Sequence, residues 1–166
     1  MSQSNPTLDL PAGPETASFR AFERVLKDDP ILGPAVKTWV TWTGSNDDLL
    51  EPTFSSCPYL RLSPYPTSSD WVSEGQHKMP LTVNIQAAVA GTRADNLLNL
   101  WNAVRLALFP QSSVAAAEAV RTVLQAAGVS KPTLRISAYA VGIDEKSGCR
   151  LLIADGTIEF NMLIST

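Results

Sequence analysis

The passage from Met79 to Pro110 constrains the fold most, because it joins a strand to a helix through a short turn. Apolar residues first occupy every second position, which is typical of a strand with one buried face. Gly91 ends this stretch, and Thr92 opens T-R-A-D, a capping-box-like helix start. Apolar residues then recur at helical spacing until Pro110 stops the helix. The alternating set is Leu81, Val83, Ile85, Ala87 and Val89, and the helical set is Leu97, Leu100, Trp101, Val104 and Leu108.

The segments around this passage predict two more helices and further strands. Residues 15–28 carry apolar side chains on one helical face, and residues 36–42 alternate in the manner of a strand. Residues 58–66 predict a short edge strand, because proline is tolerated there and not in a central strand. A helix over residues 113–127 follows, and Gly128 stands at the position after its end.

The chain closes with two predicted strands. In the last strand, Asp155-Gly156 can form a hairpin turn or a bulge, and the long apolar run around it favours a bulge within one strand. In the strand before it, one face carries Leu134, Ile136, Ala138 and Ala140, and the other carries Arg135, Ser137 and Tyr139.

The proline pattern divides the chain into an arm and a domain. Residues 1–14 predict an extended or flexible N-terminal arm with few apolar anchors, which can stay disordered or dock on a neighbouring subunit. Residues 15–166 fit a single domain of ordinary size. Within it, we expect residues 44–56 to form a loop. We expect residues 66–78 to be flexible in the free protein.

Composition limits the classes of partner. Charged residues make up 17% of the chain, against about 25% in an average soluble domain, which favours a surface that contacts other subunits. The net charge is −3 and no basic stripe is present, so we expect no direct nucleic-acid recognition. No apolar run reaches the roughly 18 residues of a membrane span. The first residues lack the pattern of a signal peptide, so the protein is expected to stay in the cytosol where it is made.

The residues that could carry chemistry are few. His77 is the single histidine, and no G-x-S-x-G elbow accompanies it, so we expect a solvated loop side chain. Cys57 and Cys149 are far apart in the sequence, which favours reduced thiols and leaves a disulfide open. The acidic pairs 47–48 and 144–145 lack EF-hand spacing and are expected to be solvated turn residues. We therefore expect no catalytic, metal or cofactor site.

The tryptophans are candidate interface residues. Trp39 and Trp42 lie on opposite faces of one predicted strand. At least one of them should therefore lie outside the core of its own subunit. The alternative is that a helix covers one face of this strand and the long loop covers the other. Trp71 lies in the turn-rich segment and can anchor it internally or insert into a neighbour. Trp101, by contrast, is expected in the core.

Two segments carry a resemblance to a known family. They are P-L-T-V-N-I-Q, residues 80–86, and D-N-L-L-N-L-W-N-A-V, residues 95–104. This strand, short turn and helix resemble the core of the tail terminator and related tail-completion proteins of long-tailed bacteriophages. The order of predicted elements over most of the chain is similar to that family as well.

The resemblance implies an α+β fold: an antiparallel sheet of about four to five strands with helices packed on one face. It implies a virion structural protein, not an enzyme, that needs no cofactor. Such subunits form a homohexameric ring at the head-proximal end of the tail, where the ring stops tube growth and forms the head-joining surface. The implied partners are other copies of the chain, the tail tube protein and head–tail connector proteins, with assembly in the host cytoplasm. The proline-rich N-terminus and residues 44–78 depart from the family pattern, so no contact residue is carried over.

Other functions stay open at this point. A different head–tail connector or neck protein would also assemble as a ring of identical subunits, but at another place in the virion. A small hydrolase would have to be built on His77. A third possibility is an α+β binding module with a small-molecule cleft between sheet and helices.

Overall fold

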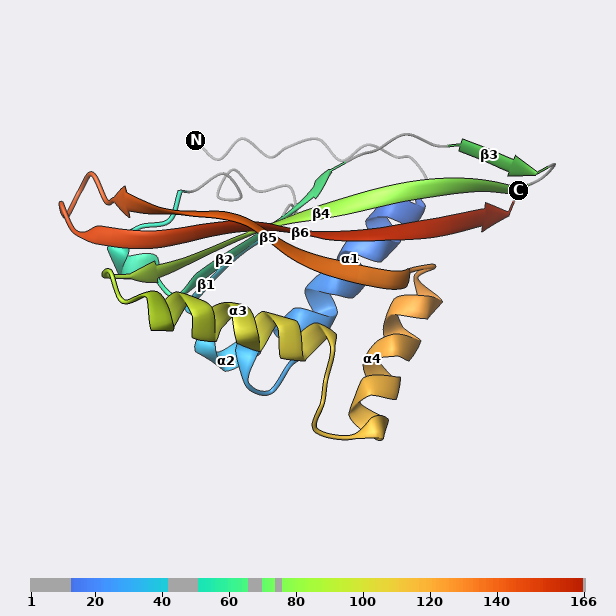
Figure 1. The fold of residues 1–166 in the computed structure, drawn as a ribbon, viewed down its shortest axis with the longest axis horizontal. Coiled ribbons are helices and arrows are strands. Elements are labelled where there is room, and N and C mark those ends of the chain that lie inside the picture. The colour runs from blue at the N-terminus through green and yellow to red at the C-terminus, as the bar shows by residue number, and fades with distance from the viewer. Residues whose placement is uncertain (1–12, 42–50, 66–69, 74–75, 166) are drawn as a thin grey trace, which may run out of the picture.

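The computed structural model describes residues 13–41, 51–65, 70–73 and 76–165, and shows one sheet with the helices on one side (Figure 1). This confirms the predicted α+β fold. The sheet has six described strands in the order β1-β2-β4-β6-β5, with β3 paired to β4. The elements are α1 (Pro14–Lys27), α2 (Leu32–Ala35), β1 (Thr38–Thr41), the 3-10 turn η2 (Phe54–Ser56), β2 (Tyr59–Tyr65), β3 (Asp70–Ser73), β4 (Gln76–Ala90), α3 (Ala94–Leu108), α4 (Val114–Ala126), β5 (Ser130–Ile143) and β6 (Arg150–Ser165).

One strand pair departs from the expected antiparallel pattern. β1 runs parallel to β2, whereas the other pairs are antiparallel. The chain between Thr41 and Tyr59 is long enough for the crossover of about a dozen residues that a parallel pair requires. This pairing also makes β2 an inner strand, although the sequence predicted an edge. Its Pro64 is tolerated because the described part of β1 ends opposite Leu62, so no described strand pairs with Pro64 on that side.

The centre of the sheet is the long ladder between β4 and β6. Its register runs without interruption from Gln76 opposite Ser165 to Ala90 opposite Leu151. β6 is therefore one long strand, as predicted, but the bulge is not in β6. The β5–β6 ladder instead has two register shifts, one between Ser130 and Thr133 and one between Ile136 and Ala138, opposite the Asp155-Gly156 step.

The segment predicted as a flexible loop contains strands. Residues 70–73 form β3, and β4 already begins at Gln76, so the predicted loop over 66–78 is wrong for these positions. His77 belongs to β4, with its backbone opposite Trp71 and Ile164, and is not a loop residue. Its side chain lies outside the described part, as do residues 66–69 and 74–75.

Local signals set where α3 and α4 begin and end. Gly91 closes β4 with a φ of 83°, a left-handed conformation that glycine adopts without strain. α3 then begins one residue later than T-R-A-D implied. Arg93 is its N-cap residue, no side chain caps the helix, and Arg93 instead pairs with Asp95 at 2.8 Å. α4 follows its prediction closely, because Ser113 accepts a hydrogen bond from the amide of Ala116 at 3.0 Å.

The core lies between the sheet and the helices, and Trp101 of α3 is at its centre. Trp101 is 3% exposed and belongs to the same buried cluster as the apolar faces of β4 and β6. Its ring lies against Gly156 of β6, where an added Cβ would stand 2.6 Å from Trp101 Cη2 and 2.6 Å from the Arg135 carbonyl oxygen. Only glycine leaves room for this approach of helix to strand. The predicted packing of the α3 stripe on Leu81, Val83 and Ile85 is confirmed.

We predict that Trp101→Ala lowers the free energy of unfolding by about 3–5 kcal/mol, because it removes a large buried ring and leaves a cavity. Thr82→Ala is the control: Thr82 lies on the opposite face of β4 and is half-buried, so its loss should cost far less. Chemical denaturation of both variants measures the difference. Wild-type stability in Trp101→Ala would contradict this placement of α3.

Candidate assembly surface

The outer strand β5 offers the most unusual surface of the described chain. Its 14 residues form one edge of the sheet, and in the described residues the strand pairs with β6 alone. The main-chain groups along its other side therefore pair with no strand of the described part. Long, uncovered edges are normally blunted in monomeric proteins, because they pair readily with another chain.

The side chains of β5 make this edge apolar. Ile136 lies opposite Gly156, Tyr139 opposite Ala154 and Val141 opposite Leu152, so they point to the helix side of the sheet. Yet α3 packs on β4 and β6 and leaves these side chains largely uncovered. Together with Leu98 of α3 they form what we call the β5 patch. Its members are between 53% and 71% exposed: Ile136, Tyr139, Val141, Ile143 and Leu98.

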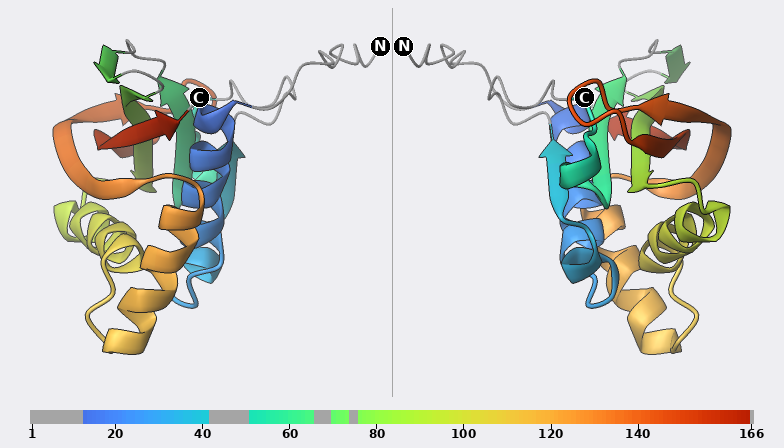
Figure 2. Two further views of the ribbon diagram at one scale, coloured as in Figure 1. Left: turned by 90° about the vertical axis from the view of Figure 1, so that its right-hand side faces the viewer. Right: turned by 90° about the vertical axis from the view of Figure 1, so that its left-hand side faces the viewer.

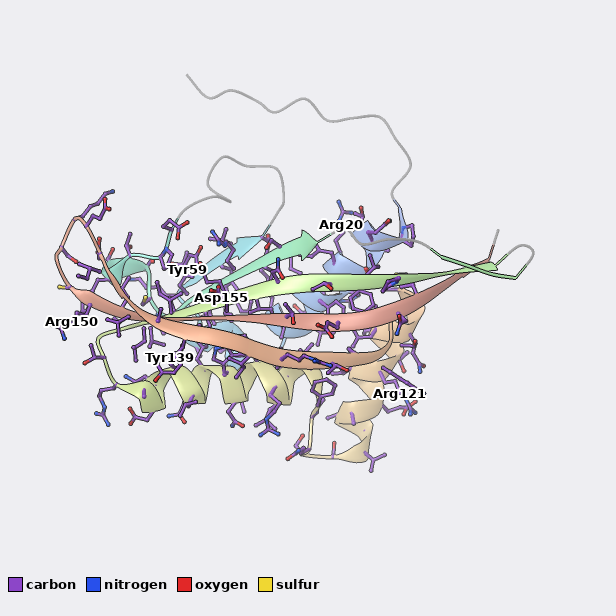
Figure 3. All side chains as sticks on the ribbon, turned by 45° about the horizontal axis from the view of Figure 1, so that its top comes forward. Arg20, Tyr59, Arg121, Tyr139, Arg150 and Asp155 are labelled. Carbon is purple, nitrogen blue, oxygen red and sulfur yellow. The ribbon has the colours of Figure 1, made fainter. Side chains whose placement is uncertain are left out.

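The register shift explains why the sequence did not predict this patch. The sequence placed Ala138 and Ala140 on the face of Leu134 and Ile136. The extra residue after Ile136 moves Tyr139 and its alternating neighbours onto that face instead. Figure 3 shows Tyr139 on β5, at the same end of the sheet as Arg150. The available signal was the alternation of Tyr139, Val141 and Ile143, which is out of phase with Leu134 and Ile136.

A groove of about 480 Å³ runs between α3 and β5, beside the patch. Its walls are mainly apolar, but it contains hydrogen-bond donors. The indole N–H of Trp101 is buried and has no acceptor in the described part of the chain. Arg105 donates to Asn102 Oδ1 at 2.5 Å, and no described carboxylate forms an ion pair with it. The lining residues are Leu98, Trp101, Asn102, Arg105, Phe109, Leu134 and Ile136.

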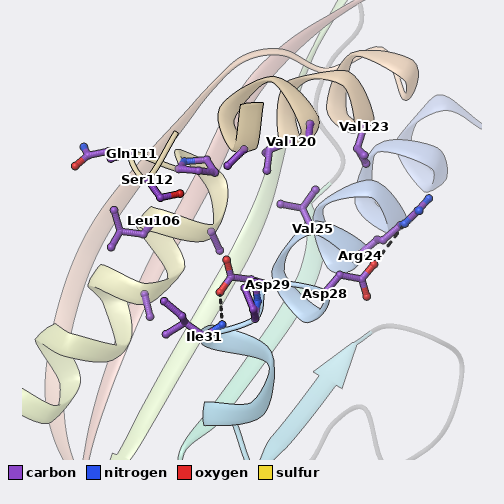
Figure 4. Close-up of a pocket in the computed structure, with 16 residues that line it drawn as sticks. Arg24, Val25, Asp28, Asp29, Ile31, Leu106, Gln111, Ser112, Val120 and Val123 are labelled. Carbon is purple, nitrogen blue, oxygen red and sulfur yellow. Dashed lines mark hydrogen bonds and ion pairs between the residues drawn. The ribbon is translucent and has the colours of Figure 1, made fainter. Parts of the chain in front are cut away.

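A second groove, of about 450 Å³, lies between α1, α3 and α4 (Figure 4). Its walls are largely alanine and valine side chains. The two carboxylates that line it form contacts with neighbouring residues of the chain. Asp28 pairs with Arg24 at 3.5 Å. Asp29 accepts hydrogen bonds from the amides of Ile31 at 3.0 Å and Leu32 at 2.7 Å. Asp29 therefore caps the start of α2, and both carboxylates already have partners within the chain.

The helix-free face of the sheet is polar in its middle. A hollow of about 290 Å³ there is lined by residues such as Arg61, Asn84 and Asp155. Gln86 Nε2 donates to Asp155 Oδ1 at 3.1 Å, and the Gln86 side-chain oxygen is buried without a partner. The two faces therefore differ sharply: one is covered by helices and the other carries uncharged and mixed-charge side chains.

Of the three tryptophans expected at an interface, only Trp39 has its side chain in the described part of the chain. Trp39 is half-buried against the core, and Lys27 Nζ stands 5.9 Å from its ring centroid in a cation–π contact. Trp42 lies outside the described residues. Trp71 is in β3, but its side chain is not described. Their role as interface residues stays a prediction.

Asp144 is not the solvated turn residue that the sequence predicted. It is 7% exposed, and its carboxylate accepts hydrogen bonds from the amides of Phe54 and Lys146, each at 3.0 Å, and from the Ser147 hydroxyl at 2.8 Å. The Phe54 amide is the main cause that lowers the pKa of Asp144 below its ordinary value. This carboxylate ties the β5–β6 turn to η2.

The two cysteines are free thiols, as the sequence favoured. Cys57 is buried beneath this tether, and burial, with Asp144 as a second cause, raises its pKa to about 11. A thiol with such a pKa is protonated at neutral pH and is a poor nucleophile. No group of three or more potential metal ligands occurs among the described residues. Likewise, none of the described helices is long and apolar enough to cross a bilayer.

Comparison with known proteins leaves the function open. No protein-family model and no curated protein matches the chain. Among solved structures, a chain of the virion of the native gene transfer agent particle aligns with 86% of this chain and 93% of its own length. The identity is 13% and the TM-score is 0.37. At that TM-score the function has to be argued from this chain's own residues.

We predict that Asp144→Asn destabilises the protein at neutral pH and much less in acid. The folded pKa is lowered, so the ionised carboxylate stabilises the fold above its ordinary pKa of about 3.9, and this contribution is lost as the pH falls through the folded pKa. Denaturation of wild type and variant at pH 7 and at roughly pH 3 measures it. Glu145→Gln, next to it and exposed, is the control. An equal loss at both pH values would show that the charge is not the cause.

Proposed function

We propose that this chain is a virion structural protein of the tail terminator type, which caps the tail tube as a ring of identical subunits. The observation that supports this most directly is the β5 patch on an open strand edge. A monomer gains nothing from four apolar side chains that are each more than half exposed on a single strand. A subunit that binds its own copies buries them.

The two edges of the sheet suit a ring. A contact between two different surfaces, repeated by rotation, closes into a ring when the angle fits, whereas a twofold dimer uses one surface twice. Here the edges are different in kind: β5 is long and apolar, and β1 is short and parallel to its neighbour. The sequence resemblance to tail terminators supplies the rest of the proposal: a homohexamer at the head-proximal end of the tail. Its partners would be the tail tube protein and head–tail connector proteins.

This function requires no catalysis. Asp144 and Cys57, a described acid and a described thiol whose pKa values are shifted, both lie at the junction between η2 and the β5–β6 turn. A ring needs only one face that fits the tube and another that does not accept more tube subunits. The polar helix-free face and the helical layer are different enough to take these two roles.

Imaging of assembled tails tests the proposal. Tails that carry a tagged copy of the chain should show one ring at the head-proximal end. Purified protein should also bind tail tubes and render them able to join heads. Label along the whole tube, a single copy per tail, or binding to heads alone would contradict the tail terminator role. The last result would favour a neck protein.

We predict that Tyr139→Ser combined with Val141→Ser prevents ring assembly and leaves the subunit folded. Both side chains are exposed in the single subunit, so the free energy of unfolding should change by no more than about 1 kcal/mol. Val114→Ser is the matched control, because Val114 is also an exposed valine but lies on α4, away from the patch. Negative-stain imaging of rings and chemical denaturation give the two readouts. Rings in the double variant would exclude the β5 patch as the contact.

A further inference from the structure

The two outer strands of the sheet lie at opposite ends of the same cross-strand rows. One row on the helix side runs from Trp39 of β1 through Leu60, Ala87 and Ala154 to Tyr139 of β5. Both views of Figure 2 show β1 (light blue) and β5 (orange) on opposite sides of the molecule. In the described part, β1 pairs with β2 alone and β5 with β6 alone. Each end of the described sheet is therefore a place where main-chain hydrogen bonds to another copy can form.

The strand directions suit a sheet that continues from one copy into the next. β5 is antiparallel to β6, β6 to β4 and β4 to β2, whereas β1 is parallel to β2. β1 and β5 consequently run in opposite directions. Rotation about a ring axis that lies along the strands keeps the direction of every strand, so β1 of the next copy meets β5 as an antiparallel partner. Antiparallel pairing is the slightly more stable arrangement and needs no crossover connection.

The side chains at the two ends of this row fit each other. Trp39 is only partly buried by its own subunit, where its ring packs on the core and Lys27 Nζ stands 5.9 Å from the ring centroid. Tyr139 is 71% exposed at the other end of the row. Two aromatic side chains on the same face of neighbouring strands form a favourable cross-strand pair. α1, which carries Lys27, would come with β1 and cover part of the β5 patch that α3 leaves exposed.

We propose that β1 of one copy pairs with β5 of the next copy in antiparallel orientation, with Trp39 packed against Tyr139. The sheet then continues from subunit to subunit through the ring. On its helix-free side, the next row places Thr38 of one copy beside Ala140 of the other. This inference rests on the proposed ring, and it adds the surface that meets the β5 patch.

Disulfide cross-linking in assembled tails tests this contact. Thr38→Cys and Ala140→Cys are combined in a chain that also carries Cys149→Ser, because Cys149 is a partly exposed free thiol. Both cysteines lie on the helix-free side, so the contact between Trp39 and Tyr139 is kept. A disulfide requires Cα atoms within about 7 Å of each other, so oxidation should link neighbouring copies into a ladder of covalent multimers up to the complete ring. Each substitution alone should leave the chain monomeric on a denaturing gel.

Thr38→Cys combined with Thr133→Cys is the matched control. Thr133 is also exposed on β5 and lies on the same face as Ala140, but near the other end of the strand, so no cross-link should form. Rings on the tails without a ladder for Thr38→Cys with Ala140→Cys would overturn the strand pairing and leave the proposed function standing. Covalent dimers from Ala140→Cys alone would show that two β5 strands pair with each other, which overturns the pairing with β1. Tails without rings would instead contradict the proposed function.

Discussion

The contact between Trp101 and Gly156 determines how the helical layer sits on the sheet. The indole ring lies against bare backbone of β6, where a Cβ would be 2.6 Å from the ring, so α3 approaches this strand closely. With α3 anchored over β4 and β6, the strand beyond them is left outside the helical layer. The apolar side chains of β5 are exposed because α3 packs on β4 and β6 and not on β5. The groove between α3 and β5 lies beside them, lined by side chains such as Leu98, Arg105 and Ile136.

Local sequence patterns predicted the helices and strands. Which side chains are exposed depends instead on the pairing of segments that are far apart in the sequence. The strand and helix around Gly91 were predictable because their periodicities are strong and span many residues. The face on which the later β5 side chains lie was not predictable. One extra residue moves every later side chain to the other face of the sheet, and whether the strand contains such a bulge depends on its partner strand. The burial of Asp144 depends on Phe54, 90 residues away. No local pattern contains that contact.

The low charge content indicated an assembly surface without locating it. The aromatic side chains drew attention to the β1 region, but Trp39 is half-buried by the core and lies near Lys27. The exposed apolar side chains of the β5 patch, which include Tyr139, lie at the opposite edge. The exposure of these side chains depends on the position of β5 at the edge of the sheet. That position depends on the topology of the whole chain, which includes a parallel pair that the sequence did not predict.

The unbroken β4–β6 ladder has a mechanical consequence. Force along the strands, pulling β4 and β6 in opposite directions, would shear all fifteen residue pairs of the ladder at once. Force applied across one end would peel the pairs apart one at a time and would need far less load. The subunit is therefore stiff along the strands and weak across them. A particle that transmits tension through such subunits withstands it best when the strands lie along the direction of pull.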